Sequence, residues 1–241
     1  MRKLVSLFFL LNSPFASAKA PADEYFKVET VAGSFIDAME IAVTPEGQVF
    51  VTERTGAVKL VDPENGKVKV IATIPVEVRK KEFARECGLL GIALDPNYEK
   101  NKWVYLYYSV QGKPGHHLAR FAFEGGQLGS EKTRLEVPHD REKSTCHEGG
   151  SLAFGPDGCL YLSTGDNTCP FQSNGSAPID EGENRKWYDA QRTSANTNDL
   201  RGKILRIRPT KNGDYTIPKG NLFPKGTAKT RPEIYVMGCR N

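Results

Sequence analysis

Three segments of the chain share one arrangement of residue types. They begin at Ile41, Ile92 and Leu152, and each passes from an aliphatic–Ala–apolar strand through a proline turn into a second strand that contains aromatic residues. The starts lie about 50 to 60 residues apart, and repeats near this length are typical of arrays of small supersecondary units. The repeat therefore predicts three strand–turn–strand units, each of which needs a neighbour to bury its apolar face.

Further strands are predicted between these pairs. The segments 57–61, 118–123 and 203–207 alternate apolar and other residues with a period near two, as half-buried antiparallel strands do. With 23 Gly and 15 Pro in 241 residues, the chain is rich in turns. These features predict an all-β chain built as a β-propeller, with three blades and a fourth unit opening at 232–241.

Propellers usually close as rings of about four to eight blades. Three to three and a half blades make an incomplete ring, and we expect one blade face to expose apolar side chains and an unpaired edge. The remaining blades, or a complementing chain, are the expected partners of that face.

The N-terminus has the pattern of a secretory signal. A basic start, Met1–Lys3, precedes a short apolar run, Leu4–Leu11, and Ala16–Ala18 or Ala18–Ala20 provides a cleavage motif. We expect a signal peptide over 1–20, a partial propeller domain over 21–241 that is truncated at its C-terminus, and a secreted or periplasmic protein. No other segment approaches the length of a membrane span.

Charge and cysteine content exclude other classes. The formal net charge is +4, and the basic residues are scattered rather than clustered, which argues against nucleic-acid binding. The five cysteines form no C-x-x-C and match no zinc framework, so structural cysteines with one or two disulfides are expected.

The segment from His147 to Asp166 contains the clearest candidate for chemistry. A histidine and a glycine pair open one strand, a Pro-Asp-Gly turn follows, and a second strand ends in Gly165-Asp166. An imidazole at the open end of a blade can accept a proton at neutral pH, and a preceding or facing carboxylate would make it a better base. His147 is thus a candidate general base. Cys146 is badly placed to share its proton, since neighbouring strand residues point to opposite faces.

Six ordered motifs give the chain a resemblance to one family. They are Val51–Gly56, Glu86–Ala93, the His147 segment, Gly202–Ile207, Asn221–Pro224 and Gly238–Asn241. In this order they resemble the N-terminal part of the soluble aldose sugar dehydrogenases of the glucose/sorbosone dehydrogenase family. The resemblance implies a six-bladed propeller of the quinoprotein type, with pyrroloquinoline quinone (PQQ) over the central channel beside a calcium ion.

The resemblance also implies residue roles. His147 corresponds to the base that takes a proton from the anomeric hydroxyl of the sugar while hydride passes to the quinone. Arg240 and Asn241 correspond to the pair that holds the quinone, and Glu86 to a position facing cofactor or substrate. Some members have Asp where this chain has Cys146. The calcium ligands are expected beyond Asn241, so no metal ligand is assigned; the partners implied are a sugar and an external electron acceptor.

Other polar residues have plainer interpretations. His116, His117 and His139 are expected to be loop residues, because no ligand spacing joins them into a metal site. Asp166 and Asn167 could reach a cation or a substrate, but the expected role of both is that of turn residues, which is the commoner case. The irregular stretch 169–201 is expected to be a long loop.

Two functions of other classes compete with sugar oxidation. One is a calcium-dependent hydrolase of the lactonase kind, for which the chain lacks an evident carboxylate set. The other is a non-catalytic propeller that binds a glycan or a protein.

Overall fold

The computed structural model describes residues 22–78, 86–140, 146–171 and 173–241. The expected signal peptide over 1–20 lies outside the described residues. The chain divides into two units, 1–30 and 31–241. In the first, the structure describes one 3-10 turn, η1 (Asp23–Tyr25). All sheets belong to the second unit, and no helix of the described residues has the length and hydropathy needed to cross a bilayer.

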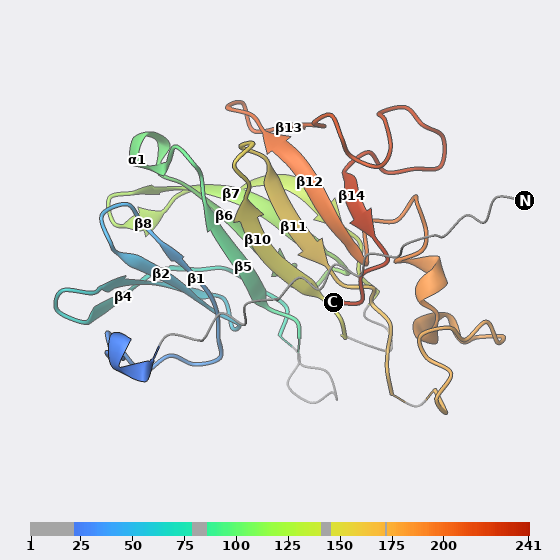
Figure 1. Cartoon of the computed structure of the whole chain (residues 1–241), viewed down its shortest axis with the longest axis horizontal. Helices are drawn as coiled ribbons and strands as arrows, with labels where there is room; N and C mark the ends of the chain where they lie inside the picture. The colour runs from blue at the N-terminus through green and yellow to red at the C-terminus, as the bar shows by residue number, and fades with distance from the viewer. Residues whose placement is uncertain (1–21, 79–85, 141–145, 172) are drawn as a thin grey trace, which may run out of the picture. The chain divides into compact units, whose positions relative to one another are not determined.

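The second unit contains three antiparallel sheets, as Figure 1 shows. The first sheet comprises β1 (Ala38–Val43), β2 (Val49–Glu53), β3 (Ala57–Asp62) and β4 (Lys67–Thr73). The second comprises β5 (Leu89–Leu94), β6 (Trp103–Ser109), β7 (His116–Glu124), β8 (Gln127–Leu128) and β9 (Lys132–Val137). The third comprises β10 (Gly149–Phe154), β11 (Leu160–Thr164), β12 (Lys203–Pro209), β13 (Tyr215–Thr216) and β14 (Ile234–Met237).

The repeat in the sequence corresponds to these sheets. Each repeat forms the first two strands of a sheet, and the three predicted further strands are β3, β7 and β12. The all-β prediction and the three units are therefore confirmed. The fourth unit is not: β14 pairs with β12 and completes the third sheet. An outer strand of one blade and an inner strand of the next have the same local pattern, so only pairing distinguishes them.

Strand β6 shows why the middle sheet is so apolar. Val104, Leu106 and Tyr108 pack toward the first sheet, in a core that contains Phe50. Tyr105 and Tyr107 pack toward the third sheet. Because successive side chains of a strand point to opposite faces, both faces of this sheet are buried.

The first strands of the three sheets lie together. Glu40 of β1 accepts hydrogen bonds from the Ile92 amide of β5 (2.9 Å) and the Ser151 hydroxyl of β10 (2.7 Å). Between β5 and β10 the backbones approach so closely that a Cβ on Gly91 would lie 2.0 Å from the carbonyl oxygen of Gly150. Strands β5 and β10 are neighbours in Figure 1. This blade-by-blade stacking is that of a propeller whose ring does not close within the described residues.

The first sheet exposes apolar side chains, as expected for an open array. Ile41 and Val43 of β1 are 60% and 58% exposed, and Val70 of β4 is 53% exposed. The stretch 169–201 agrees with the prediction of a long loop: in its described residues, 169–171 and 173–201, the structure has only the 3-10 turns η2 (Lys186–Tyr188) and η3 (Ala190–Arg192). The helix α1 (Tyr98–Asn101), between β5 and β6, is four residues long.

The expected disulfides are not found. In the described residues the cysteine side chains are thiols, three of them buried.

Lys203 is a fully buried lysine that anchors the loop before β12. Its Nζ donates to the carbonyl oxygens of Thr193 (2.7 Å), Ser194 (3.0 Å) and Arg201 (2.8 Å). Burial lowers the pKa of Lys203 to about 8. The three donors of an ammonium group match the three acceptors.

We expect Lys203→Met to destabilise the protein. The change leaves buried carbonyl groups without a donor, so the free energy of unfolding should fall by about 3 kcal/mol. Urea denaturation measures it, with Lys211→Met as the control because Lys211 is exposed. Equal midpoints for the two variants would contradict the anchoring role.

Candidate active site

The candidate base lies in a strained turn just before β10. The backbone of His147 has φ 55°, a left-handed conformation that residues other than glycine rarely adopt. Gly149 and Gly150 follow with φ 65° and 124°, which explains the glycine pair. The turn holds the His147 ring inside the protein, where its side chain is 5% exposed.

The His147 ring faces a buried carboxylate. Its Nδ1 lies 2.7 Å from Oδ1 of Asp166, whose side chain is 2% exposed. The same Oδ1 accepts the Thr168 amide at 2.8 Å. A carboxylate accepts from Nδ1–H, and this leaves Nε2 as the proton acceptor of the ring. Asp166 is thus more than a turn residue, and only the pairing of β10 with β11 brings it to His147.

Gly165 allows this approach. A Cβ on Gly165 would lie 1.7 Å from the carbonyl oxygen of His147 and 2.1 Å from its carbonyl carbon. No side chain fits at this position without moving the histidine. The Gly-Asp pair that ends β11 is therefore explained by the histidine turn that it contacts.

The other three candidate residues lie around the same turn. Glu86 accepts the Glu148 amide through Oε2 (3.2 Å), and Asn241 accepts the Gly149 amide through Oδ1 (2.8 Å). The carbonyl oxygen of Arg240 accepts the Asp166 amide at 2.9 Å. In Figure 1 the chain end marked C lies beside the ends of β10 and β11. Residues more than 150 positions apart in sequence thus meet at one turn.

The side chains of Arg240 and Asn241 are exposed, and Glu86 is half-buried. Near the buried His147–Asp166 pair the chain therefore exposes the amide of Asn241, whose Oδ1 contacts the turn, and the side chain of Arg240, whose backbone contacts Asp166. A guanidinium and an amide are groups that bind anionic, planar ligands.

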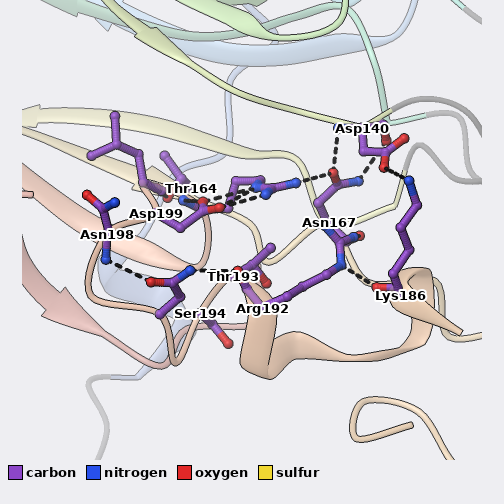
Figure 2. A network of polar contacts seen from close by, with 12 residues as sticks. Asp140, Thr164, Asn167, Lys186, Arg192, Thr193, Ser194, Asn198 and Asp199 are labelled. Atoms are coloured by element: carbon purple, nitrogen blue, oxygen red, sulfur yellow. Dashed lines mark hydrogen bonds and ion pairs between the residues drawn. The ribbon is translucent and has the colours of Figure 1, made fainter. Parts of the chain in front are cut away.

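A polar network fixes the residue after Asp166 (Figure 2). The side chain of Asn167 exchanges hydrogen bonds with the backbone of Asp140, at 2.6 and 3.1 Å. Its Oδ1 also accepts Nη1 of Arg201 (3.2 Å), and its carbonyl oxygen accepts Nη2 of Arg192 (3.2 Å). Since Asn167 is fully buried, these bonds hold the long loop against the Asp166 turn.

A second buried group of side chains surrounds Glu148, the residue that follows His147. Glu148 contacts Nε2 of His116 (2.5 Å) and receives the Cys87 thiol (2.6 Å) and the Ser109 hydroxyl (2.8 Å). Nε2 of His139 lies 3.8 Å from the same carboxylate.

Burial alone would raise the pKa of Glu148. The nearby His116 and His139, together with the hydrogen bonds from His116 and Cys87, outweigh that effect and lower the pKa to about 2. The carboxylate is therefore held ionised.

The expectation that His116 and His117 are loop residues is wrong, because both lie in β7. His139 does lie in a loop after β9, but its buried ring meets Glu148 together with the ring of His116. Sequence spacing missed them because they come from separate strands and loops. The sequence does contain a sign of this group, because its polar residues lie at or near the ends of strands. Sequence pattern alone predicts that such residues are exposed to solvent.

The fold and the site together define a class of protein: a β-propeller-type protein with a buried histidine–carboxylate pair beside the start of β10 and the end of β11. Comparison gives the family. The profile described as Glucose / Sorbosone dehydrogenase matches residues 35–241, and the chain belongs to that family.

Relatives and solved structures agree with this assignment. The chain is 32% identical to an uncharacterized Synechocystis protein over 88% of this chain and 50% of that protein. It is 26% identical to quinoprotein glucose dehydrogenase B of Acinetobacter calcoaceticus, over 96% of this chain and 47% of that enzyme. The PQQ-bound aldose sugar dehydrogenase of Streptomyces coelicolor matches with a TM-score of 0.65 and 28% identity, over 89% of this chain and 54% of that structure.

The chain spans about half the length of these curated relatives. Human Hedgehog-interacting protein is also similar, at 27% identity over 80% of this chain and 27% of that protein.

Proposed function

We propose that the protein oxidises the anomeric hydroxyl of an aldose sugar to a lactone, with PQQ as cofactor. One observation carries the proposal: the buried His147–Asp166 pair lies at the turn that Glu86 and Asn241 contact and that Arg240 adjoins. Membership of the glucose/sorbosone dehydrogenase family supports the reaction class.

In this mechanism His147 is the general base. Nε2 accepts the proton of the C1 hydroxyl, while the C1–H bond breaks and its electron pair leaves as hydride. The side chain of Asp166 orients the ring through Nδ1 and stabilises the imidazolium that forms. PQQ, when bound, supplies the two-electron acceptor. The sugar loses two electrons and becomes a lactone, and an external acceptor takes the electrons afterwards.

The residues present fit such a cofactor. PQQ is planar and polyanionic, and the exposed guanidinium of Arg240 can bind a carboxylate bidentately or stack on a ring. Asn241 and Glu86 are the other residues that would hold the quinone or the sugar. For calcium, the proposal assigns no ligand among the described residues. The basic and apolar start of the sequence supports an exported protein.

A dye-linked assay tests the function. The protein at its full encoded length is incubated with PQQ, calcium, an aldose and an electron-accepting dye. We expect dye reduction that requires both the aldose and PQQ, and PQQ affinity about tenfold weaker in Arg240→Gln. Arg208→Gln is the matched control, because Arg208 is an exposed arginine of β12 that is not assigned to the site. Failure to bind PQQ and to reduce the dye would contradict the proposal.

Replacing Asp166 by Asn tests the positioning of the base. The amide can donate to Nδ1 and favour the tautomer that has its proton on Nε2, so we expect kcat to fall roughly 100-fold or more with KM little changed. Steady-state kinetics over a range of pH measures this. A normal kcat with a raised KM would instead assign Asp166 to substrate binding.

The similarity to Hedgehog-interacting protein favours a second candidate, a propeller that binds a protein partner. The same assay separates the two: a binding protein shows no PQQ-dependent turnover.

A further inference from the structure

His116, His139 and Glu148 form a buried cluster behind the His147 turn, with the Cys87 thiol beside it. We propose that this histidine–glutamate cluster, with Cys87 as fourth ligand, binds a divalent transition-metal ion of the zinc type. The inference does not rest on the proposed sugar oxidation, because it uses none of the residues assigned to the base or the quinone.

The donor atoms already converge. One ligand atom from each of the three residues lies within 4.8 Å of the others. His116 Nε2 is 2.5 Å and His139 Nε2 is 3.8 Å from the Glu148 carboxylate, and Cys87 Sγ is 2.6 Å from it. In a tetrahedral zinc site with bonds near 2.0–2.3 Å, ligand atoms lie roughly 3.4 Å apart. Small side-chain movements would therefore open the cluster around an ion.

Packing keeps the ligands in place. The His116 and Glu148 side chains are each 1% exposed, and the His139 side chain is 2% exposed. The Tyr107 ring stacks on His116 at 5.0 Å with an interplanar angle of 15°, and His139 meets His116 edge-on at 4.8 Å. A site so fixed loses little conformational entropy when it binds an ion.

The donor set selects the metal. Two imidazoles, a thiolate and one carboxylate suit Zn²⁺ and its first-row neighbours, whereas Ca²⁺ and Mg²⁺ prefer six or more oxygen ligands or water. Binding releases the proton of the Cys87 thiol and leaves the Glu148 carboxylate ionised. The cluster is thus chemically distinct from a calcium site.

The position of the cluster suggests its role. Cys87 precedes β5, His116 begins β7, His139 follows β9, and Glu148 precedes β10. An ion held by all four would join the second and third sheets. Because Glu148 is the neighbour of His147, the ion would also stiffen the turn that holds the candidate base.

Metal titration tests the proposal without any sugar. The purified protein is stripped with a chelator and titrated with Zn²⁺ against a chromophoric competitor, and separately with Co²⁺ by absorption. We expect one ion per chain, a higher Tm with Zn²⁺, and a thiolate-to-cobalt charge-transfer band. His139→Gln should weaken Zn²⁺ binding at least about 100-fold, and Cys87→Ser should remove the band.

Two controls isolate the cluster. His117→Gln changes a neighbouring histidine that faces Glu131 and Glu136 instead, and should bind Zn²⁺ like the wild type. Cys169→Ser removes a half-buried thiol outside the cluster and should keep the cobalt band. Should His139→Gln fold poorly, Cys87→Ser remains informative because it keeps the size of the side chain. No bound ion, or binding unchanged in both variants, would overturn the proposal; neither result bears on PQQ-dependent turnover.

Discussion

We expect the replacement of His147 by alanine to lower the proposed rate of aldose oxidation by roughly three orders of magnitude, the middle of the range for a lost general base. Without the imidazole, Asp166 no longer positions a proton acceptor for the C1 hydroxyl. The measurement is the rate at which the bound quinone of the PQQ-loaded protein is reduced by the sugar in a single turnover, without dye. It separates the chemical step from the transfer of electrons to the acceptor.

His147→Asn is the sharper variant of this experiment. His147 has φ 55°, and asparagine tolerates that conformation better than alanine does. The asparagine amide can still donate to Asp166 but cannot act as a base, so the fold should be kept and the activity lost. His117→Ala, which changes an imidazole outside the site, should keep full activity. Wild-type rates in His147→Asn would show that the base is another residue.

The second large effect is expected at Gly165. Gly165→Ala places a Cβ 1.7 Å from the carbonyl oxygen of His147. The oxygen is a backbone atom and the Cβ is fixed by the backbone, so neither can move aside as the end of a flexible side chain would. We expect the free energy of unfolding to fall by about 3 kcal/mol. The displaced histidine turn should also lose most of the catalytic rate.

Gly33→Ala is the matched control, because a Cβ there has open space and the residue has no left-handed backbone. Chemical denaturation and the dye-linked assay are run on both variants. A Gly165→Ala protein as stable and active as Gly33→Ala would mean that the close contact with His147 does not exist in solution.

The strand pairs of the propeller could be predicted because their causes are local. Ile41–Val43, Ile92–Leu94 and Leu152–Phe154 each have the aliphatic–Ala–apolar pattern of a strand and each precede a turn. The last strand could not be assigned in this way. Ile234–Met237 is the same short apolar run whether it opens a new sheet or closes an old one, and only its pairing with β12 decides.

The candidate site divides similarly. The resemblance to the family suggests roles for His147, Glu86, Arg240 and Asn241, and these roles stay predictions. Hydrogen bonds join Glu86 and Asn241 to the His147 turn and the backbone of Arg240 to Asp166. The sequence pattern predicts a turn residue at Asp166, because aspartate is common in turns. Its role as the partner of His147 depends on the register between β10 and β11.

The amino-acid sequence by itself determined the all-β class, the three repeated units and the histidine turn, because strand periodicity, turn chemistry and glycine conformations act over a few residues. Only the tertiary structure decided which polar side chains share an environment. Cys87, His116, His139 and Glu148 are separated by up to 61 residues and meet because two sheets pack face to face. Burial, which makes such a group an ionised network or a metal site, is a property of that packing.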